Sequence, residues 1–146
     1  MQPFDDNYFM KLALEEAKLA EQQGEVPVGA IVVCNNKIIA RAHNQTEMLN
    51  DVTAHAEILA ITAAANHLGA KYLKDCTLYV SLEPCVMCAG AIAWAQVGCL
   101  VYGAEDKKRG FSIFAKNALP PSTKVRKLVM HEETGQIISD FFKKKR

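Results

Sequence analysis

A histidine, a glutamate and two cysteines stand at spacings that suit a metal centre. His55 and Glu57 lie two residues apart, and Cys85 and Cys88 form a Cys-x-x-Cys pair, which allows two sulfur atoms to reach one zinc ion. With His55 the set supplies three protein ligands, and a three-ligand zinc keeps its fourth position for water. Glu57 adds a nearby carboxylate that need not bind the metal. The pattern therefore predicts a hydrolytic zinc site.

The charge of the predicted centre gives Glu57 a role. A zinc ion with two thiolates and one neutral imidazole is formally neutral, so it polarises bound water less than a three-histidine site does. Zinc can lower the pKa of bound water toward about 7, and a general base matters more where part of that effect is lost. Glu57 can accept the proton of the water and pass it to a leaving group. Such proton transfer suits the hydrolytic replacement of an amine by oxygen.

The alternative interpretation is a structural zinc ion, which needs a fourth protein ligand. None of the candidates for that ligand has a second Cys-x-x-Cys or His-x-x-x-His partner. These candidates are Cys34, Cys76, Cys99, His43 and His67. The structural interpretation leaves Glu57 without a role and predicts a zinc-stabilised RNA-binding or interaction module that does not catalyse a reaction.

Helical and strand patterns alternate along the chain, which favours a layered α/β fold. Strands are predicted over residues 30–34, 37–42, 77–82, 99–103 and 125–130. Helices are predicted over residues 6–23, 54–68 and 84–96, and a last helix is predicted to follow Gly135 and reach 143–146. Residues 107–122 are expected to be irregular.

Local signals refine these elements. Asn35 and Asn36 predict a tight hairpin turn, Thr53 or Asp51 is expected to cap the second helix, and Pro84 suits the first turn of the third. Both halves of the metal motif then lie at helix N-termini, whose partial positive charge favours thiolate over thiol.

Composition bounds the domain organisation and the compartment. At 146 residues, half of them hydrophobic, the chain is expected to form one domain, residues 1–146, with a full core. No stretch reaches the roughly 18 apolar residues of a membrane span. Five cysteines, two of them in a metal-type motif, favour the cytoplasm, with Cys34, Cys76 and Cys99 as small buried apolar residues. The net charge of +1 points neither toward nor away from nucleic acid.

Several segments carry a family resemblance. They are EVPVGA at 25–30, AHN at 42–44, TAHAE at 53–57, TLYV at 77–80, LEPCVMCAGA at 82–91, VYGA at 101–104 and SDFF at 139–142. The chain resembles the zinc superfamily of cytidine and deoxycytidylate deaminases, and within it the bacterial tRNA-specific adenosine deaminases. The resemblance implies a three-layer α/β/α fold with a mixed five-stranded central sheet.

The resemblance also implies roles for particular residues. His55, Cys85 and Cys88 would hold one zinc ion per chain, and Glu57 would shuttle protons while a zinc-activated water attacks C6 of a flipped-out adenine and ammonia leaves. The remaining implied positions are two substrate contacts, Asn44 for the target nucleoside and Asp106 for the tRNA anticodon loop.

A homodimer is implied as well, and Trp94 is expected in the core or at the dimer interface. Two segments depart from the family pattern where RNA and a second subunit would be met. Residues 109–117 replace a Gly/Ser-rich segment, and residues 131–136 lack an acidic-cysteine pattern. Deamination of a free base or nucleoside, of the guanine or cytosine type, therefore stands as an alternative within the same class.

Overall fold

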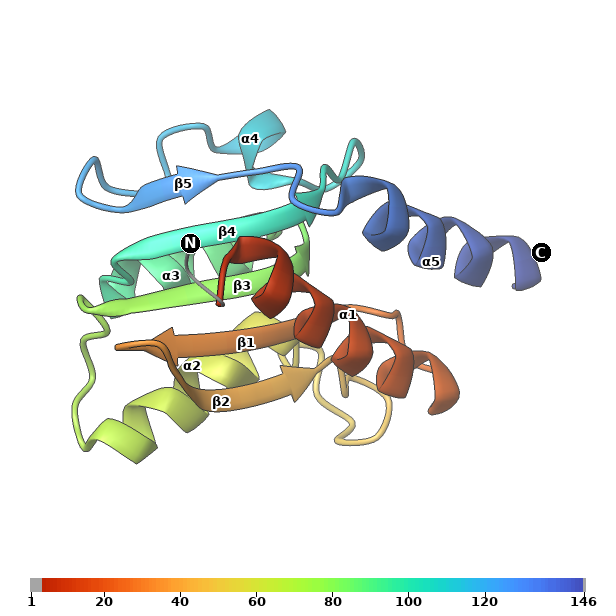
Figure 1. The fold of residues 1–146 in the computed structure, drawn as a ribbon. Coiled ribbons are helices and arrows are strands. Elements are labelled where there is room, and N and C mark those ends of the chain that lie inside the picture. The colour runs from red at the N-terminus through yellow and green to blue at the C-terminus, as the bar shows by residue number, and fades with distance from the viewer. Residues whose placement is uncertain (1–3, 146) are drawn as a thin grey trace.

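The computed structural model, which describes residues 4–145, contains a sheet of five strands (Figure 1). The strands are β1 (Gly29–Cys34), β2 (Lys37–His43), β3 (Cys76–Leu82), β4 (Cys99–Ala104) and β5 (Lys124–Arg126). Their order is β2-β1-β3-β4-β5. β1 pairs antiparallel with β2 and β3, whereas β3, β4 and β5 run parallel. The prediction of a mixed five-stranded sheet is confirmed.

Helices cover both faces of this sheet. The longer ones are α1 (Asp6–Gln22), α2 (Ala56–Leu68), α3 (Val86–Ala95) and α5 (His131–Lys144), and a short helix α4 (Phe111–Phe114) lies between β4 and β5 along the chain. α1 and α5 lie on one face, and α2 and α3 lie on the other (Figure 1). The three-layer α/β/α arrangement is therefore confirmed.

The interior strand β1 shows why the sheet needs helices on both faces. Alternate side chains of a strand point to opposite faces, and Ile31 and Val33 pack in a cluster with Phe9 and Ala13 of α1. Val32 belongs to the cluster on the side of α2 and α3. Because both faces are buried, β1 shows the uninterrupted apolar run expected of such a strand.

Two backbone features fix how β1 starts and ends. Gly29 lies so close to α1 that a Cβ atom there would be 2.0 Å from the Ala13 carbonyl oxygen and 2.6 Å from the Ala17 nitrogen. At the other end, Asn35 and Asn36 have φ angles of +53° and +61°. These angles confirm the predicted two-residue hairpin turn into β2.

The C-terminal third differs from the prediction. β5 is only three residues long, because regular pairing ends before Leu128 and Met130, which both have positive φ. The Leu128 and Val129 N–H groups still donate to carbonyl groups of β4. The last helix does not begin after Gly135. Gly135 lies inside α5, where a Cβ atom would be 3.4 Å from Ala104. The region expected to be irregular contains α4. Arg146, assigned to the last helix, lies outside the described residues.

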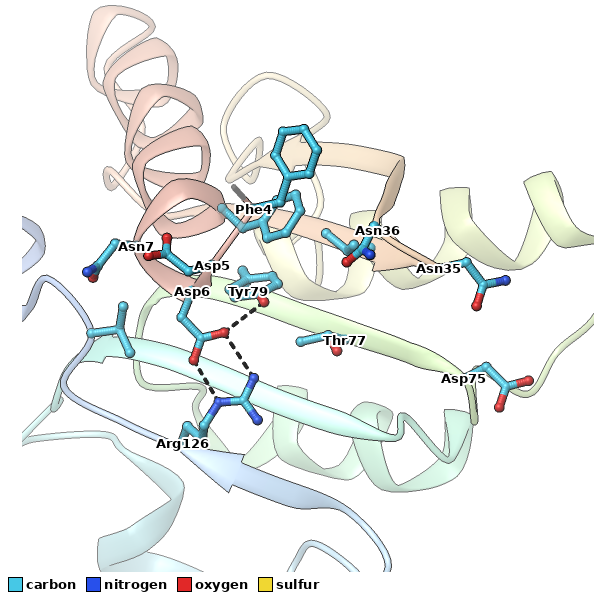
Figure 2. Close-up of a pocket in the computed structure, with 13 residues that line it drawn as sticks. Phe4, Asp5, Asp6, Asn7, Asn35, Asn36, Asp75, Thr77, Tyr79 and Arg126 are labelled. Atoms are coloured by element: carbon cyan, nitrogen blue, oxygen red, sulfur yellow. Dashed lines mark hydrogen bonds and ion pairs between the residues drawn. The ribbon is translucent and has the colours of Figure 1, made fainter. Parts of the chain in front are cut away.

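A polar network ties the start of α1 to the sheet on the face opposite α2 and α3 (Figure 2). Arg126 donates to both carboxylate oxygens of Asp6, through Nε at 2.6 Å and Nη2 at 2.9 Å. The Tyr79 hydroxyl donates to the same carboxylate at 2.9 Å. The hydrogen bonds from Arg126 lower the pKa of Asp6. The network therefore links α1, β3 and β5 through one ionised group.

A pocket of about 690 Å³ surrounds this network and includes Asp5, Asn35 and Asp75 (Figure 2). Its titratable groups are mainly carboxylates on the α1 side of the sheet, away from the Cys-x-x-Cys segment. Within residues 4–145, no helix is long and apolar enough to cross a membrane.

Gly29→Ala should destabilise the protein strongly, because the new methyl group would collide with the backbone of α1 rather than with a movable side chain. We expect the free energy of unfolding to fall by about 3 kcal/mol or more, measured by urea denaturation. Gly135→Ala is the matched control, since a Cβ atom there would lie 3.4 Å from the Ala104 side chain and collide with no backbone atom. It should raise stability by about 0.5–1 kcal/mol, because alanine favours the helix interior. Equal loss in both variants would contradict the close α1–β1 approach.

Candidate active site

His55, Cys85 and Cys88 converge in the structure. Their potential ligand atoms all lie within 4.8 Å of one another. His55 Nδ1 lies 3.4 Å from Cys88 Sγ and 3.7 Å from Cys85 Sγ. One nitrogen and two sulfur donors at these separations can share an ion of the size of zinc. Among residues 4–145, no other histidine, cysteine, aspartate or glutamate joins this group.

The three donors belong to the N-termini of two helices. His55 is the N-cap of α2 and Cys85 is the N-cap of α3, and neither side chain makes a capping hydrogen bond. Each instead points to the shared centre, where Cys88, from the first turn of α3, is fully buried. The expected placement at two helix N-termini is confirmed, whereas Pro84 lies before the N-cap rather than in the first turn of α3.

The capping of α2 differs from the prediction. Neither Thr53 nor Asp51 caps the helix, because Asp51 Oδ1 accepts hydrogen bonds from the backbone N–H and hydroxyl of Thr53 itself. The acceptor comes from the end of β2: Asn44 Oδ1 accepts from the Ala56 N–H at 2.8 Å. Asn44 is 8% exposed. Its carbonyl oxygen is thus engaged by the first turn of α2.

Glu57 lies in the first turn of α2 and is 4% exposed. Burial raises the pKa of Glu57 to about 7. A carboxylate with such a pKa can take up and release a proton near neutral pH. The structure therefore places an acid–base group beside the histidine and thiol cluster.

The thiols and the imidazole interact strongly. Hydrogen bonds from Cys88 and His55 lower the pKa of Cys85 to about 4. The hydrogen bond with Cys85 raises the pKa of His55. Interaction with Cys85 and burial raise the pKa of Cys88, because a second thiolate there would face the first. A divalent cation would relieve this repulsion, since metals bind cysteine as the thiolate.

The chain matches known deaminases along nearly its whole length. The family of MafB19-like deaminases matches residues 4–146. The tRNA-specific adenosine deaminase of Aquifex aeolicus is 46% identical over 143 residues, 95% of each chain. This chain belongs to the deaminase family. A solved structure from a study of A-to-I editing by tRNA:A34 deaminases is 43% identical and covers 89% of this chain and 98% of its own, with a TM-score of 0.83.

A guanine deaminase from Bacillus subtilis gives a second structural comparison within the family. It is 38% identical and covers 81% of this chain and 79% of its own, with a TM-score of 0.70. Relatives with this fold therefore include deaminases of more than one kind of substrate.

Two buried glutamates of this deaminase chain had no role assigned by sequence reasoning. Glu25, 1% exposed, accepts hydrogen bonds from the Glu47 N–H at 3.1 Å, the Met48 N–H at 2.8 Å and the Thr46 hydroxyl at 3.3 Å. It thereby holds the loop between Asn44 and α2. The sequence signal was a charged residue directly before the apolar run that enters β1.

Glu83, 2% exposed, holds the loop after β4 in the same way. Its Oε1 accepts from the Asp106 N–H at 3.0 Å, and its Oε2 accepts from the Ser112 N–H and hydroxyl at 3.0 and 2.6 Å. Gly110 of this loop forms a β-bridge with Cys85. The loop is therefore joined directly to the candidate metal centre.

The structure gives Asp106 a local role in this loop. Its carboxylate accepts from the backbone N–H groups of Lys108 and Arg109, each at 3.0 Å. The substrate contact expected of Asp106 stays a prediction.

Among the alternative zinc ligands, His43 lies away from the cluster and forms hydrogen bonds with Glu16 and Gln23 at 2.9 and 3.2 Å.

Glu57→Gln should stabilise the metal-free protein at high pH. The pKa of Glu57 is raised from 4.5 to about 7 on folding, so the folded protein binds the Glu57 proton more tightly than the unfolded chain does. That contribution is fully present below pH 4.5 and is lost as the pH rises through about 7. At pH 8 we expect the variant to exceed the wild type by about 3 kcal/mol in the free energy of unfolding.

Urea unfolding of the metal-free proteins at pH 4.5 and pH 8 measures this difference, which should vanish at the lower pH. Glu133→Gln, an exposed carboxylate on α5, is the control and should change stability by less than about 0.5 kcal/mol at either pH. A pH-independent effect of Glu57→Gln would show that its desolvation is not the cause.

Proposed function

We propose that this chain is a zinc-dependent hydrolytic deaminase that converts adenosine to inosine at the wobble position of tRNA anticodons. The observation that carries the proposal is the convergence of His55, Cys85 and Cys88 beside the buried carboxylate of Glu57. The full-length similarity to tRNA-specific adenosine deaminases supports this substrate class. Residues 1–146 act in this proposal as one catalytic domain.

His55 Nδ1 and the thiolates of Cys85 and Cys88 hold one zinc ion in this proposal. Bound there, zinc supplies Lewis-acid activation of water. Glu57 accepts a proton from the attacking water and delivers it to the departing amine, which leaves as ammonia. Its burial supports this role, because a pKa of about 7 lets the same carboxylate act first as base and then as acid.

Asn44 and Asp106 are the proposed substrate contacts. Since Asn44 Oδ1 already accepts from the Ala56 N–H, the side-chain amide nitrogen is the group left to donate to the nucleoside. Asp106 lies on the loop that Glu83 holds through the Asp106 N–H and that bridges to Cys85 through Gly110, and this connection supports a role for Asp106 near the site. The same hydrogen bonds that shape the site therefore orient both groups.

Glu57→Ala should lower deamination of tRNA by about a hundred- to ten-thousand-fold, the usual contribution of a general acid–base group. Inosine formed in tRNA, measured by nuclease digestion and chromatography, gives the rate. Zinc content should stay near one ion per chain, because the three ligands are untouched. Full turnover in the variant would remove Glu57 from the mechanism.

The wild-type protein incubated in parallel with tRNA and with free guanine, cytosine and adenosine identifies the substrate class. We expect inosine in tRNA and no ammonia from the free compounds. Ammonia from guanine with unchanged tRNA would instead support a free-base deaminase of the kind seen in the Bacillus subtilis relative. A zinc absorption-edge spectrum with four protein ligands and no turnover would support the structural-zinc module.

We further propose a homodimer through the exposed face of α3. Of the two locations expected for Trp94, the core is wrong, because the side chain is 85% exposed. It borders a pocket of about 510 Å³ that also includes Tyr72 and Val86, both partly exposed apolar side chains. α3 contains no charged residue. An exposed apolar surface of this kind is typical of a protein–protein interface. A second copy of the chain can bury it by packing the same surface across a two-fold axis.

Trp94→Asp should weaken this dimer by about 2 kcal/mol or more, as expected for a central aromatic residue of an interface. Sedimentation equilibrium of the wild type and the variant measures the change in self-association. Phe142→Asp is the matched control, because Phe142 is 48% exposed on α5, across the sheet from α3. Equal dissociation in both variants, or a monomeric wild type, would exclude this interface.

A further inference from the structure

Cys34 of β1 and Cys76 of β3 lie opposite each other on adjacent strands. They are direct Cα partners at one end of the antiparallel β1–β3 pair. Cys76 belongs to the core cluster on the face of α2 and α3, and Cys34 packs against the same cluster. Directly opposed residues of antiparallel strands have Cβ atoms about 4.5–5.5 Å apart. The two thiols are therefore neighbours, although they are far apart in the sequence.

The backbone places the two cysteines in a non-hydrogen-bonded pair. Cys34 is joined to Lys37 by the two-residue turn and pairs with it in the hairpin, so the polar backbone groups of Cys34 point toward β2. The Cys76 N–H donates to the Leu73 carbonyl at 3.1 Å instead of to β1. Non-hydrogen-bonded partners have Cα atoms about 4.5 Å apart, within the range of about 4.4–6.8 Å for disulfides.

The two thiols differ in access to solvent. Cys34 is partly exposed, whereas Cys76 is 1% exposed, and both are free thiols. Burial and the adjacent Cys34 thiol raise the pKa of Cys76 to about 12. An oxidant in solution therefore meets Cys34 first. Once Cys34 is part of a mixed disulfide, its thiol no longer contributes to the raised pKa of Cys76.

We propose that Cys34 and Cys76 form a reversible disulfide by exchange with a small-molecule disulfide. Cys34 Sγ attacks one sulfur of the small disulfide, and the first small thiol leaves with a proton. Cys76 Sγ then attacks Cys34 Sγ, the protein disulfide forms, and the second small thiol leaves. The two protein thiols are oxidised by two electrons, and the small disulfide is reduced to two thiols.

The disulfide would act on the segment that carries half of the candidate site. Residues 34–76 include Asn44, His55 and Glu57, and the cross-link closes this whole stretch into one covalent loop. Closing a loop of this length restricts the unfolded chain and raises stability. The cross-link leaves Cys85 and Cys88 free for the metal. It therefore protects the site segment without consuming a metal ligand.

The test treats the metal-containing protein with oxidised glutathione, blocks remaining thiols with N-ethylmaleimide and maps the peptides by mass spectrometry. We expect a cross-link between the peptides of Cys34 and Cys76 that dithiothreitol reverses. Cys99→Ser should form the same cross-link. Cys76→Ser should stop at a glutathione adduct on Cys34, because the resolving thiol is absent.

Thermal unfolding gives a second measurement. The oxidised wild type and oxidised Cys99→Ser should unfold at a higher temperature than their reduced forms, whereas Cys76→Ser should show no such increase. A wild type that keeps a glutathione adduct on Cys34 without the cross-link would overturn the proposal. So would cross-links that involve Cys85, Cys88 or Cys99 in place of Cys76. None of these readouts depends on deamination or on its substrate.

Discussion

Two helix N-termini face the same small volume, and the candidate active site depends on this convergence. Each helix begins with unpaired backbone N–H groups and a partial positive charge. At α2 and α3 the N-cap positions are His55 and Cys85, whose side chains point to each other's helix instead of capping their own. The positive ends favour the thiolate form of the cysteines. A divalent cation there would neutralise the charge of the two thiolates, which otherwise repel each other.

The convergence is held by polar side chains that come from the strand ends. Asn44, directly after β2, completes the first turn of α2 through its bond to the Ala56 N–H. Glu83, directly after β3, fixes the loop that bridges back to Cys85. Both residues are buried, so their hydrogen bonds are shielded from water. These two side chains thus hold the first turn of α2 and the loop beside the start of α3 in place.

The sequence predicted the grouping of His55, Cys85 and Cys88 and most elements because these depend on local spacing: Cys-x-x-Cys, His55 with Glu57, and the two asparagines of the hairpin turn. It did not predict the cap of α2, because the acceptor of Asn44 reaches Ala56 across a loop rather than from the preceding residues. Gly135 looked like a break since its packing partner, Ala104, lies on another element. The exposure of Trp94 was equally hidden, since an apolar helix pattern does not distinguish a core from an interface.

The loop after β4 combines a firmly held backbone with exposed basic side chains. Its backbone is fixed at Asp106 and Ser112 by Glu83, and at Gly110 by the bridge to Cys85. Between these anchors, the side chains of residues 107–109 are exposed and all three are basic. Changes at such positions alter the charge presented to an anionic substrate without moving the metal ligands. Within the divergent segment 109–117, the Arg109 side chain is exposed, whereas Gly110 bridges to Cys85, Phe111 is buried in the core and Ser112 donates to Glu83. The segment therefore differs from the family pattern and still packs against the candidate active site.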